Sequence, residues 1–129
     1  MKIEHLGLWV QDLELMRSFY LNYFDTSSGV KYVNPKTQFE AYFIYFGESK
    51  TRLELMKRPD ILPDNGKRGF NMGIAHFAIS LGGKDKVNEL TERMRNDNYR
   101  IFSEPRTTGD GYYETVVLDP EGNYLEISA

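Results

Sequence analysis

One pattern occurs twice in this chain, and each copy carries one of its two histidines. Residues 3–10 read IEHLGLWV, and residues 74–81 read IAHFAISL. His5 and His76 occupy the same place in the two copies. A repeat of this kind predicts a duplicated module in which a strand leads into a helix and further strands.

A second phrase closes each half and carries a glutamate. RLELM at 52–56 contains Glu54, and YLEIS at 124–128 contains Glu126. The glutamate follows the histidine by 49 residues in the first half and by 50 in the second (54 − 5 and 126 − 76). An unpaired histidine or carboxylate is costly to bury among apolar strand residues. Because a bound metal ion would remove this cost, the repeat predicts a metal site as well as a duplicated module.

The overall composition limits the class of protein. A chain of 129 residues, 40% of them hydrophobic, predicts one domain that buries roughly two-thirds of its unfolded surface. The net charge of −3 without a basic stripe argues against nucleic acid as a partner, and no apolar run is long enough to predict a membrane span. The absence of cysteine excludes disulfides, thiolate zinc sites and cysteine nucleophiles. Because the chain starts in a strand with no signal-peptide pattern, we expect a cytoplasmic protein.

The periodicity of apolar residues predicts the same order of elements in both halves. In the first half a helix begins after Asp12, a plausible N-cap, and the second helix has Val87, Leu90 and Met94 as its apolar stripe. The expected strands are 3–10, 30–34, 38–46 and 51–57 in the first half, and 74–81, 99–103, 112–118 and 124–128 in the second.

This order predicts an α+β fold of two tandem β-α-β-β-β modules. The modules are expected at 1–58 and 73–129 of a single domain, joined by a linker at 59–72 that is rich in proline and glycine. Together they would form a curved mixed sheet around a metal-binding cleft.

Because side chains alternate along a strand, the histidine and the glutamate of each half are expected on the sheet face away from the apolar core. His5 and Glu54 point away from the face that carries the apolar core residues, and His76 and Glu126 do the same. If the two sheets curl toward each other, the four side chains converge. Two imidazoles and two carboxylates suit one divalent ion such as zinc, nickel, cobalt, manganese or iron.

Each of these residues also has an ordinary structural interpretation. A single strand histidine is more often a hydrogen-bonded core or surface residue than a ligand, and a single Leu-Glu-Leu is more often an edge strand with its charge in solvent. The repetition of both residues at matching offsets favours the metal site over four independent coincidences.

The expected hairpins predict the walls of the cleft. A turn at 47–50 places Phe43 opposite Glu54, and pairing of Leu118 with Asn123 places Thr115 opposite Glu126. The predicted wall consists of Trp9, Ala41, Phe43, Tyr45, Met56, Ala78, Tyr113, Thr115 and Val117, with Arg52 as its one cation. We expect a small, partly apolar substrate to contact Trp9, Phe43, Tyr113 and Thr115. Alternatively, several of these rings simply fill the space between sheets.

The duplicated phrases and the stretches 109–114 and 118–126 resemble the vicinal oxygen chelate superfamily over nearly the whole chain. This superfamily includes glyoxalase I, fosfomycin-resistance proteins, bleomycin-resistance proteins and extradiol dioxygenases. The second stretch, LDPEGNYLE, is similar to small glyoxalase-like bacterial members. The resemblance implies paired β-α-β-β-β modules and a homodimer, with each metal site either within one chain or shared with a partner.

The resemblance also implies roles for individual residues. His5, Glu54, His76 and Glu126 match the metal ligands of glyoxalase I, in which a ligand carboxylate, here Glu126, takes a carbon-bound proton while the metal holds an enediolate. Trp9 stands where glyoxalase I has an arginine for glutathione, and Arg58 stands where an asparagine is common. The expected function is therefore a metal-dependent lyase or isomerase of small carbonyl compounds that does not strictly require glutathione.

Two other functions within the same superfamily stay open. An extradiol-type dioxygenase needs only His5, His76 and Glu126 around iron, and Glu54 would then occupy a position required for substrate or oxygen. A binding protein of the bleomycin-resistance type would sequester a drug or metabolite in the aromatic cleft without chemistry.

Overall fold

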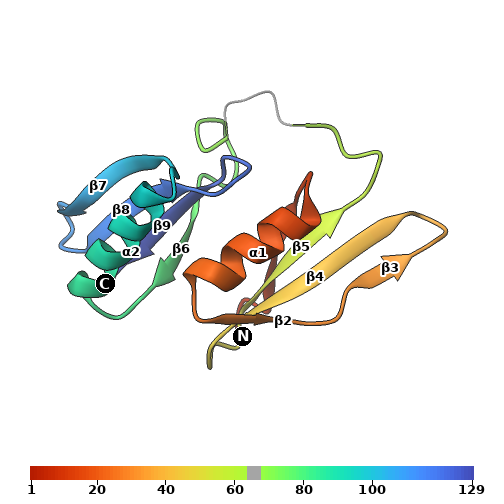
Figure 1. Ribbon diagram of the computed structural model, residues 1–129, viewed down its shortest axis with the longest axis horizontal. Coiled ribbons are helices and arrows are strands. Elements are labelled where there is room, and N and C mark those ends of the chain that lie inside the picture. The colour runs from red at the N-terminus through yellow and green to blue at the C-terminus, as the bar shows by residue number, and fades with distance from the viewer. Residues whose placement is uncertain (64–67) are drawn as a thin grey trace. The chain divides into compact units, whose positions relative to one another are not determined.

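In the computed structural model, which describes residues 1–63 and 68–129, the repeated pattern folds as two units (Figure 1). The first unit ends at Pro63, and the second comprises the remainder of the chain. The expected linker, 59–72, lies partly outside the described residues because it includes 64–67. Each unit packs one helix on one face of its own mixed sheet. The predicted α+β fold of two β-α-β-β-β-type modules is therefore confirmed.

The first unit contains one helix and five strands. Its elements are β1 (His5–Trp9), α1 (Leu13–Tyr23), β2 (Thr26–Ser28), β3 (Tyr32–Asn34), β4 (Phe39–Phe46) and β5 (Arg52–Lys57). The strand order is β1-β5-β4-β2, with β3 also paired to β4; β1 and β5 run parallel. The expected strand at 30–34 is thus the shorter β3, and β2 was missed because its sequence, TSS, has no apolar alternation.

Helix α1 covers the face of this sheet that carries the buried strand residues. Asp12 caps the helix, since its side chain accepts a hydrogen bond from the backbone N–H of Leu15 at 2.9 Å, as its sequence position predicts. The buried residues of this layer are Leu13, Met16, Phe19 and Tyr20 from the helix and Ile44, Leu53 and Leu55 from the sheet. The opposite face of the sheet has no helix on it in this unit.

The second unit repeats the arrangement with four strands. Its elements are β6 (Phe77–Ser80), α2 (Lys84–Asn96), β7 (Ile101–Thr107), β8 (Tyr113–Leu118) and β9 (Tyr124–Ser128), in the sheet order β6-β9-β8-β7. The predicted helix stripe of Val87, Leu90 and Met94 is buried. It lies on the sheet face that carries Leu125 and Ile127. In both units, therefore, apolar strand residues face the helix and their alternate neighbours face away; we call the second surface the open face of each sheet.

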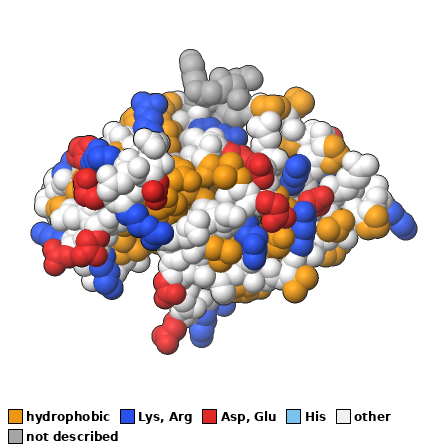
Figure 2. Space-filling view, in the orientation of Figure 1, with side chains coloured by type: hydrophobic (Ala, Val, Ile, Leu, Met, Phe, Trp, Pro, Cys, Tyr) orange, Lys and Arg blue, Asp and Glu red, His pale blue; other side chains and the backbone are white. Residues whose placement is uncertain are grey.

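Two further observations concern the surface charges and the helices. Acidic and basic side chains are intermixed on the visible side of both units (Figure 2). In the described part of the chain, no helix is long and apolar enough to cross a membrane.

Candidate functional site

The first histidine–glutamate pair lies on the open face of the first unit. His5 begins β1, and Glu54 lies on the parallel neighbour β5, where its register partner is Gly7. Gly7 has no side chain, and the Met56 side chain packs over it: a Cβ atom at position 7 would come within 2.8 Å of Met56 Cε. The His5 Nε2 and Glu54 Oε2 atoms are 3.5 Å apart. The structure therefore brings together the two residues of this half that the sequence singled out.

Three side chains, those of Glu4, Arg52 and Phe43, lie around His5. The Glu4 carboxylate contacts His5 Nδ1 and is itself held by the Arg52 guanidinium. Arg52 in turn lies 4.1 Å from the centre of the Phe43 ring, and the His5 ring meets Phe43 edge-on at 5.6 Å. The hydrogen bond with His5 holds the pKa of Glu4 below its usual range; desolvation opposes this, and the charge of Arg52 adds to it. Glu4 is therefore a carboxylate at neutral pH.

The second pair lies on the open face of the second unit. Glu126 lies in the middle of β9, with Ala78 of β6 as its register partner. His76 Nε2 and Glu126 Oε2 are 3.3 Å apart. His76 directly precedes β6, so the strand expected at 74–81 begins three residues later than the sequence indicated.

A third acid, Glu114, lies beside this second pair and was not identified from the sequence. It belongs to β8, pairs with Ser128, and is only 9% exposed. Burial raises the pKa of Glu114, the negative charge of the neighbouring Glu126 raises it further, and Arg106 at 3.6 Å opposes both. A carboxylate in the otherwise apolar strand 112–118 was the available signal, but only the correct strand register places it on the face of Glu126.

The register of the second hairpin differs from the predicted one and changes the sheet face of Tyr113 and Thr115. Leu118 pairs with Tyr124, so that Val116 lies opposite Glu126 and Thr115 lies opposite the core residue Ile127. The expected pairing of Leu118 with Asn123 was wrong by one residue, because the loop closes with three residues between Asp119 and Asn123. Gly122, with a φ of +81°, occupies the left-handed position that such a loop requires.

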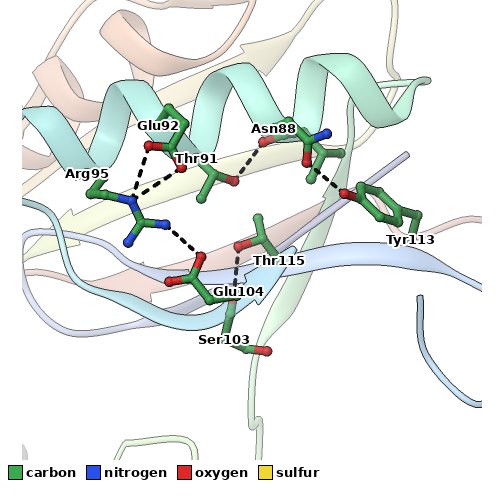
Figure 3. A network of polar contacts seen from close by, with 9 residues as sticks. Asn88, Thr91, Glu92, Arg95, Ser103, Glu104, Tyr113 and Thr115 are labelled. Carbon is green, nitrogen blue, oxygen red and sulfur yellow. Dashed lines mark hydrogen bonds and ion pairs between the residues drawn. The ribbon is translucent and has the colours of Figure 1, made fainter. Parts of the chain in front are cut away.

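Tyr113 and Thr115 consequently face helix α2, as Figure 3 shows. The Tyr113 hydroxyl donates to Asn88 Oδ1 of α2 at 2.7 Å. Thr115 is 1% exposed, and its hydroxyl donates to the Ser103 carbonyl at 2.8 Å. The predicted placement of these two residues on the face of Glu126 was therefore wrong, and Val117, also placed in the wall, is fully buried on the helix side.

The first hairpin agrees with the predicted register. Phe43 lies opposite Glu54, and Ala41 lies opposite Met56. Trp9 is 36% exposed on the open face, packs edge-on against Phe39 at 6.1 Å, and has the Arg58 guanidinium 5.5 Å above its ring. Two of the four expected substrate contacts, Trp9 and Phe43, therefore share a sheet face with the first pair.

The spacing within each pair fits joint coordination of one ion. Two donors that each lie about 2.1 Å from an ion are about 3.0 Å apart in octahedral and about 3.4 Å apart in tetrahedral geometry. The distance of 3.3 Å in the second pair lies close to the tetrahedral value, and the distance of 3.5 Å in the first pair slightly exceeds it. Each unit supplies one nitrogen and one oxygen donor. Among the described residues, no group of three or more histidine, cysteine or acidic side chains that could hold a metal ion is found.

Paired β-α-β-β-β modules, each with a histidine and a glutamate on its open face, define the class of protein. The chain belongs to the Glyoxalase/Bleomycin resistance protein/Dioxygenase superfamily, whose sequence pattern it matches over residues 2–127. It is 26% identical over 134 residues to the Bacillus subtilis (strain 168) protein YqjT, described as uncharacterized, and the match covers 98% of both proteins.

Solved structures share the fold at low sequence identity. The trypanothione-dependent glyoxalase I of Leishmania major is 23% identical, with a TM-score of 0.77 over 99% of this chain and 86% of that one. A glyoxylase/bleomycin resistance protein/dioxygenase domain from Frankia sp. EAN1pec is 16% identical, with a TM-score of 0.83 over 99% and 96% of the two chains. Glyoxalase I from Zea mays is 23% identical, with a TM-score of 0.78, and this chain covers 44% of its length.

Proposed function

We propose that this protein is a divalent-metal-dependent lyase or isomerase of the glyoxalase type. His5, Glu54, His76 and Glu126 would hold the ion, within one chain or between the subunits of a homodimer. The observation that supports this most is the repetition of one geometry: a histidine nitrogen and a glutamate oxygen 3.5 and 3.3 Å apart on the open face of each module.

The proposed chemistry is a proton shift next to a carbonyl group. The bound ion would supply positive charge to stabilise the substrate oxygens, where negative charge develops. The Glu126 carboxylate takes the proton from the carbon beside the carbonyl and returns it to the neighbouring carbon. Glu126 suits this role because it lies on an open face, with its side chain 22% exposed, within reach of a substrate.

The open face of the first unit supports a substrate with an apolar part. Trp9, Phe39 and Phe43 offer aromatic surface there, and Met56 adds a flexible apolar side chain. Trp9 stands in place of a glutathione-binding arginine. We therefore propose a small carbonyl compound as substrate, without a strict requirement for glutathione.

Metal analysis and a substrate screen test the proposal. Purified protein is expected to contain one of zinc, nickel, cobalt, manganese or iron, and to convert a small 2-oxoaldehyde either alone or with one of several thiols. Glu126→Gln should lower kcat by at least about 100-fold, because a general base contributes about 10²- to 10⁴-fold. Glu104→Gln, which removes an exposed carboxylate paired with Arg95, is the matched control and should leave kcat unchanged. Absence of bound metal, or unchanged turnover in Glu126→Gln, would overturn the proposal.

A binding protein without catalysis is the second candidate. The exposed aromatic side chains of the first unit, among them Tyr32 at 56% and Trp9 at 36%, favour it. Ligand binding that persists after metal chelation, together with no turnover of any carbonyl substrate, would support this candidate. Oxygen uptake with catechols under ferrous loading would instead indicate a dioxygenase, against which Glu54 argues as a fourth ligand.

A further inference from the structure

We propose that Glu4 and Arg52 are positioning residues that fix the tautomer of His5, so that Nδ1 carries the proton and Nε2 presents a bare lone pair toward Glu54. Among the residues that the structure describes, His76 has no counterpart of this support, so the two halves of the proposed metal site are unequal. Only the consequence for metal affinity rests on the proposed function; the tautomer is a property of the protein alone.

The contacts form a continuous chain of charged groups. His5 Nδ1 meets one oxygen of Glu4, and the other oxygen of Glu4 meets the Arg52 guanidinium. Arg52 is held from its other side by the Phe43 ring at 4.1 Å. Glu4 is a carboxylate and has no proton to give, so the hydrogen between it and His5 belongs to Nδ1.

The backbone holds Glu4 in place although half of its side chain is exposed. The Arg52 N–H donates to the Glu4 carbonyl at 3.1 Å, and the Thr51 hydroxyl donates to the Ile3 carbonyl at 2.9 Å. These bonds attach the two residues before β1 to the start of β5. The carboxylate that orients His5 is thereby fixed to the same strand as Glu54.

A consequence follows for the other ring nitrogen. A neutral imidazole has one N–H, so a proton on Nδ1 leaves Nε2 as an acceptor. Nε2 then faces Glu54 Oε2 at 3.5 Å, a pair of acceptors with no hydrogen to share. Such a pair is electrostatically unfavourable on its own and is relieved by a cation placed against both atoms. An outer carboxylate that holds the far nitrogen is the usual support of a metal-binding histidine.

The second module does not repeat this support. Ala75 precedes His76 where Glu4 precedes His5, and Tyr124 precedes Glu126 by two residues where Arg52 precedes Glu54. Ala75 has no side-chain atom that could accept a hydrogen bond from the ring as Glu4 does, and Tyr124 does not supply the charge of Arg52. Both halves therefore contain a histidine and a glutamate at matching positions. The sequence repeats neither Glu4 nor Arg52 at the corresponding positions of the second half.

Nitrogen-15 NMR of the metal-free protein at alkaline pH tests the tautomer directly. The chain contains only two histidines, so His76 serves as an internal reference in the same spectrum. His5 is expected as the Nδ1–H tautomer in the native protein, and as a mixture in Glu4→Ala. Glu4→Gln, which keeps a neutral acceptor, should restore the tautomer in part, whereas the His76 signals should stay unchanged in all variants. An Nε2–H tautomer or a doubly protonated His5 at this pH would overturn the proposal.

Metal titration tests the consequence and separates the two proposals. Glu4→Ala and Arg52→Met should weaken binding of zinc to the metal-free protein by about 10- to 100-fold, and Glu104→Gln should leave it unchanged. Unaltered zinc affinity in Glu4→Ala would refute the positioning role while leaving the proposed function intact. Failure of the native protein to bind any divalent ion, with His5 still the Nδ1–H tautomer, would refute the proposed function alone.

Discussion

At the scale of single residues, Asp119 determines how two strands of the second unit align. Its Oδ1 atom accepts hydrogen bonds from the backbone N–H groups of Glu121 and Asn123 at 3.0 and 2.8 Å, and its Oδ2 atom accepts from Asn123 Nδ2 at 2.7 Å. The residue is only 4% exposed, and burial raises its pKa although these hydrogen bonds oppose the shift. One buried carboxylate therefore closes the loop that sets the pairing of β8 with β9.

Replacement of Asp119 should destabilise the second unit. Asp119→Ala leaves two backbone donors and one side-chain donor without their acceptor, and we expect a loss of about 1–3 kcal/mol in the free energy of unfolding. Asp119→Asn keeps Oδ1 as an acceptor for the backbone and should lose less. Urea denaturation of the two variants against the native protein measures the difference. Equal stability of Asp119→Ala and the native chain would show that the loop closes without this side chain.

At the scale of elements, an ion cluster ties α1 to the strand that it covers. The Lys31 ammonium lies 2.7 Å from Glu40 of β4 and 3.2 Å from Glu14 of α1, and the hydroxyl of Tyr42 donates to Glu14 at 3.1 Å. The hydrogen bond from Lys31 lowers the pKa of Glu40, and the same bond raises the pKa of Lys31; desolvation opposes each shift.

This cluster predicts a contribution to stability that depends on pH. The lowered pKa of Glu40 gives stability that is present above its ordinary value of 4.5 and is lost as pH falls through the folded value. The raised pKa of Lys31 gives stability that is present below its ordinary value of 10.5 and is lost as pH rises through the folded value. Both side chains are about a third exposed, so the pair should contribute about 0.2–1 kcal/mol between these limits.

Lys31→Met is the variant that measures this contribution. It should lower the free energy of unfolding by that amount at pH 7 and by less at pH 3, which lies below the ordinary pKa of 4.5 of the Glu40 carboxyl. Chemical denaturation at the two pH values, with Lys36→Met as a control for surface charge, gives the comparison. The same loss at both pH values would mean that Lys31 acts through packing on Tyr42 and not through its charge.

The sequence predicted the helices better than it predicted which face of a strand each side chain occupies. Asp12 and the apolar spacing of the helices predicted α1 and α2, because capping and the 3.6-residue period are local properties of the chain. Tyr113 and Thr115 were assigned to the wrong face because strand alternation fixes only which residues share a face. Which face that is depends on the length of the loop at 119–123, and a shift of one residue exchanges the two faces.

At the scale of the whole molecule, the proposed site needs one histidine–glutamate pair from each unit. His5→Ala and His76→Ala should each weaken zinc binding by more than about 100-fold, since a lost ligand costs more than a lost outer partner. If each variant alone kept native affinity, the two pairs would not serve one ion. The measurement is zinc titration of each purified variant.

A mixture of the two variants distinguishes the two possible homodimer arrangements. If a site combines the first unit of one subunit with the second unit of its partner, a mixed dimer contains one intact site and one site lacking both histidines. Refolding the variants together should then restore up to about a quarter of the native zinc content, because half of the dimers are mixed. If the site lies within one chain, no mixture restores binding.

The sequence by itself determined the duplication, the helix of each module, and the sharing of one sheet face by the histidine and glutamate of each half. These features follow from local periodicity and from residue identity. Only the tertiary structure decided the register of the second hairpin, the burial of Glu114 beside Glu126, and the contact of Glu4 with His5. The hairpin register depends on how the loop closes, and the two contacts depend on the conformations of the side chains. Alternation along a strand predicts neither.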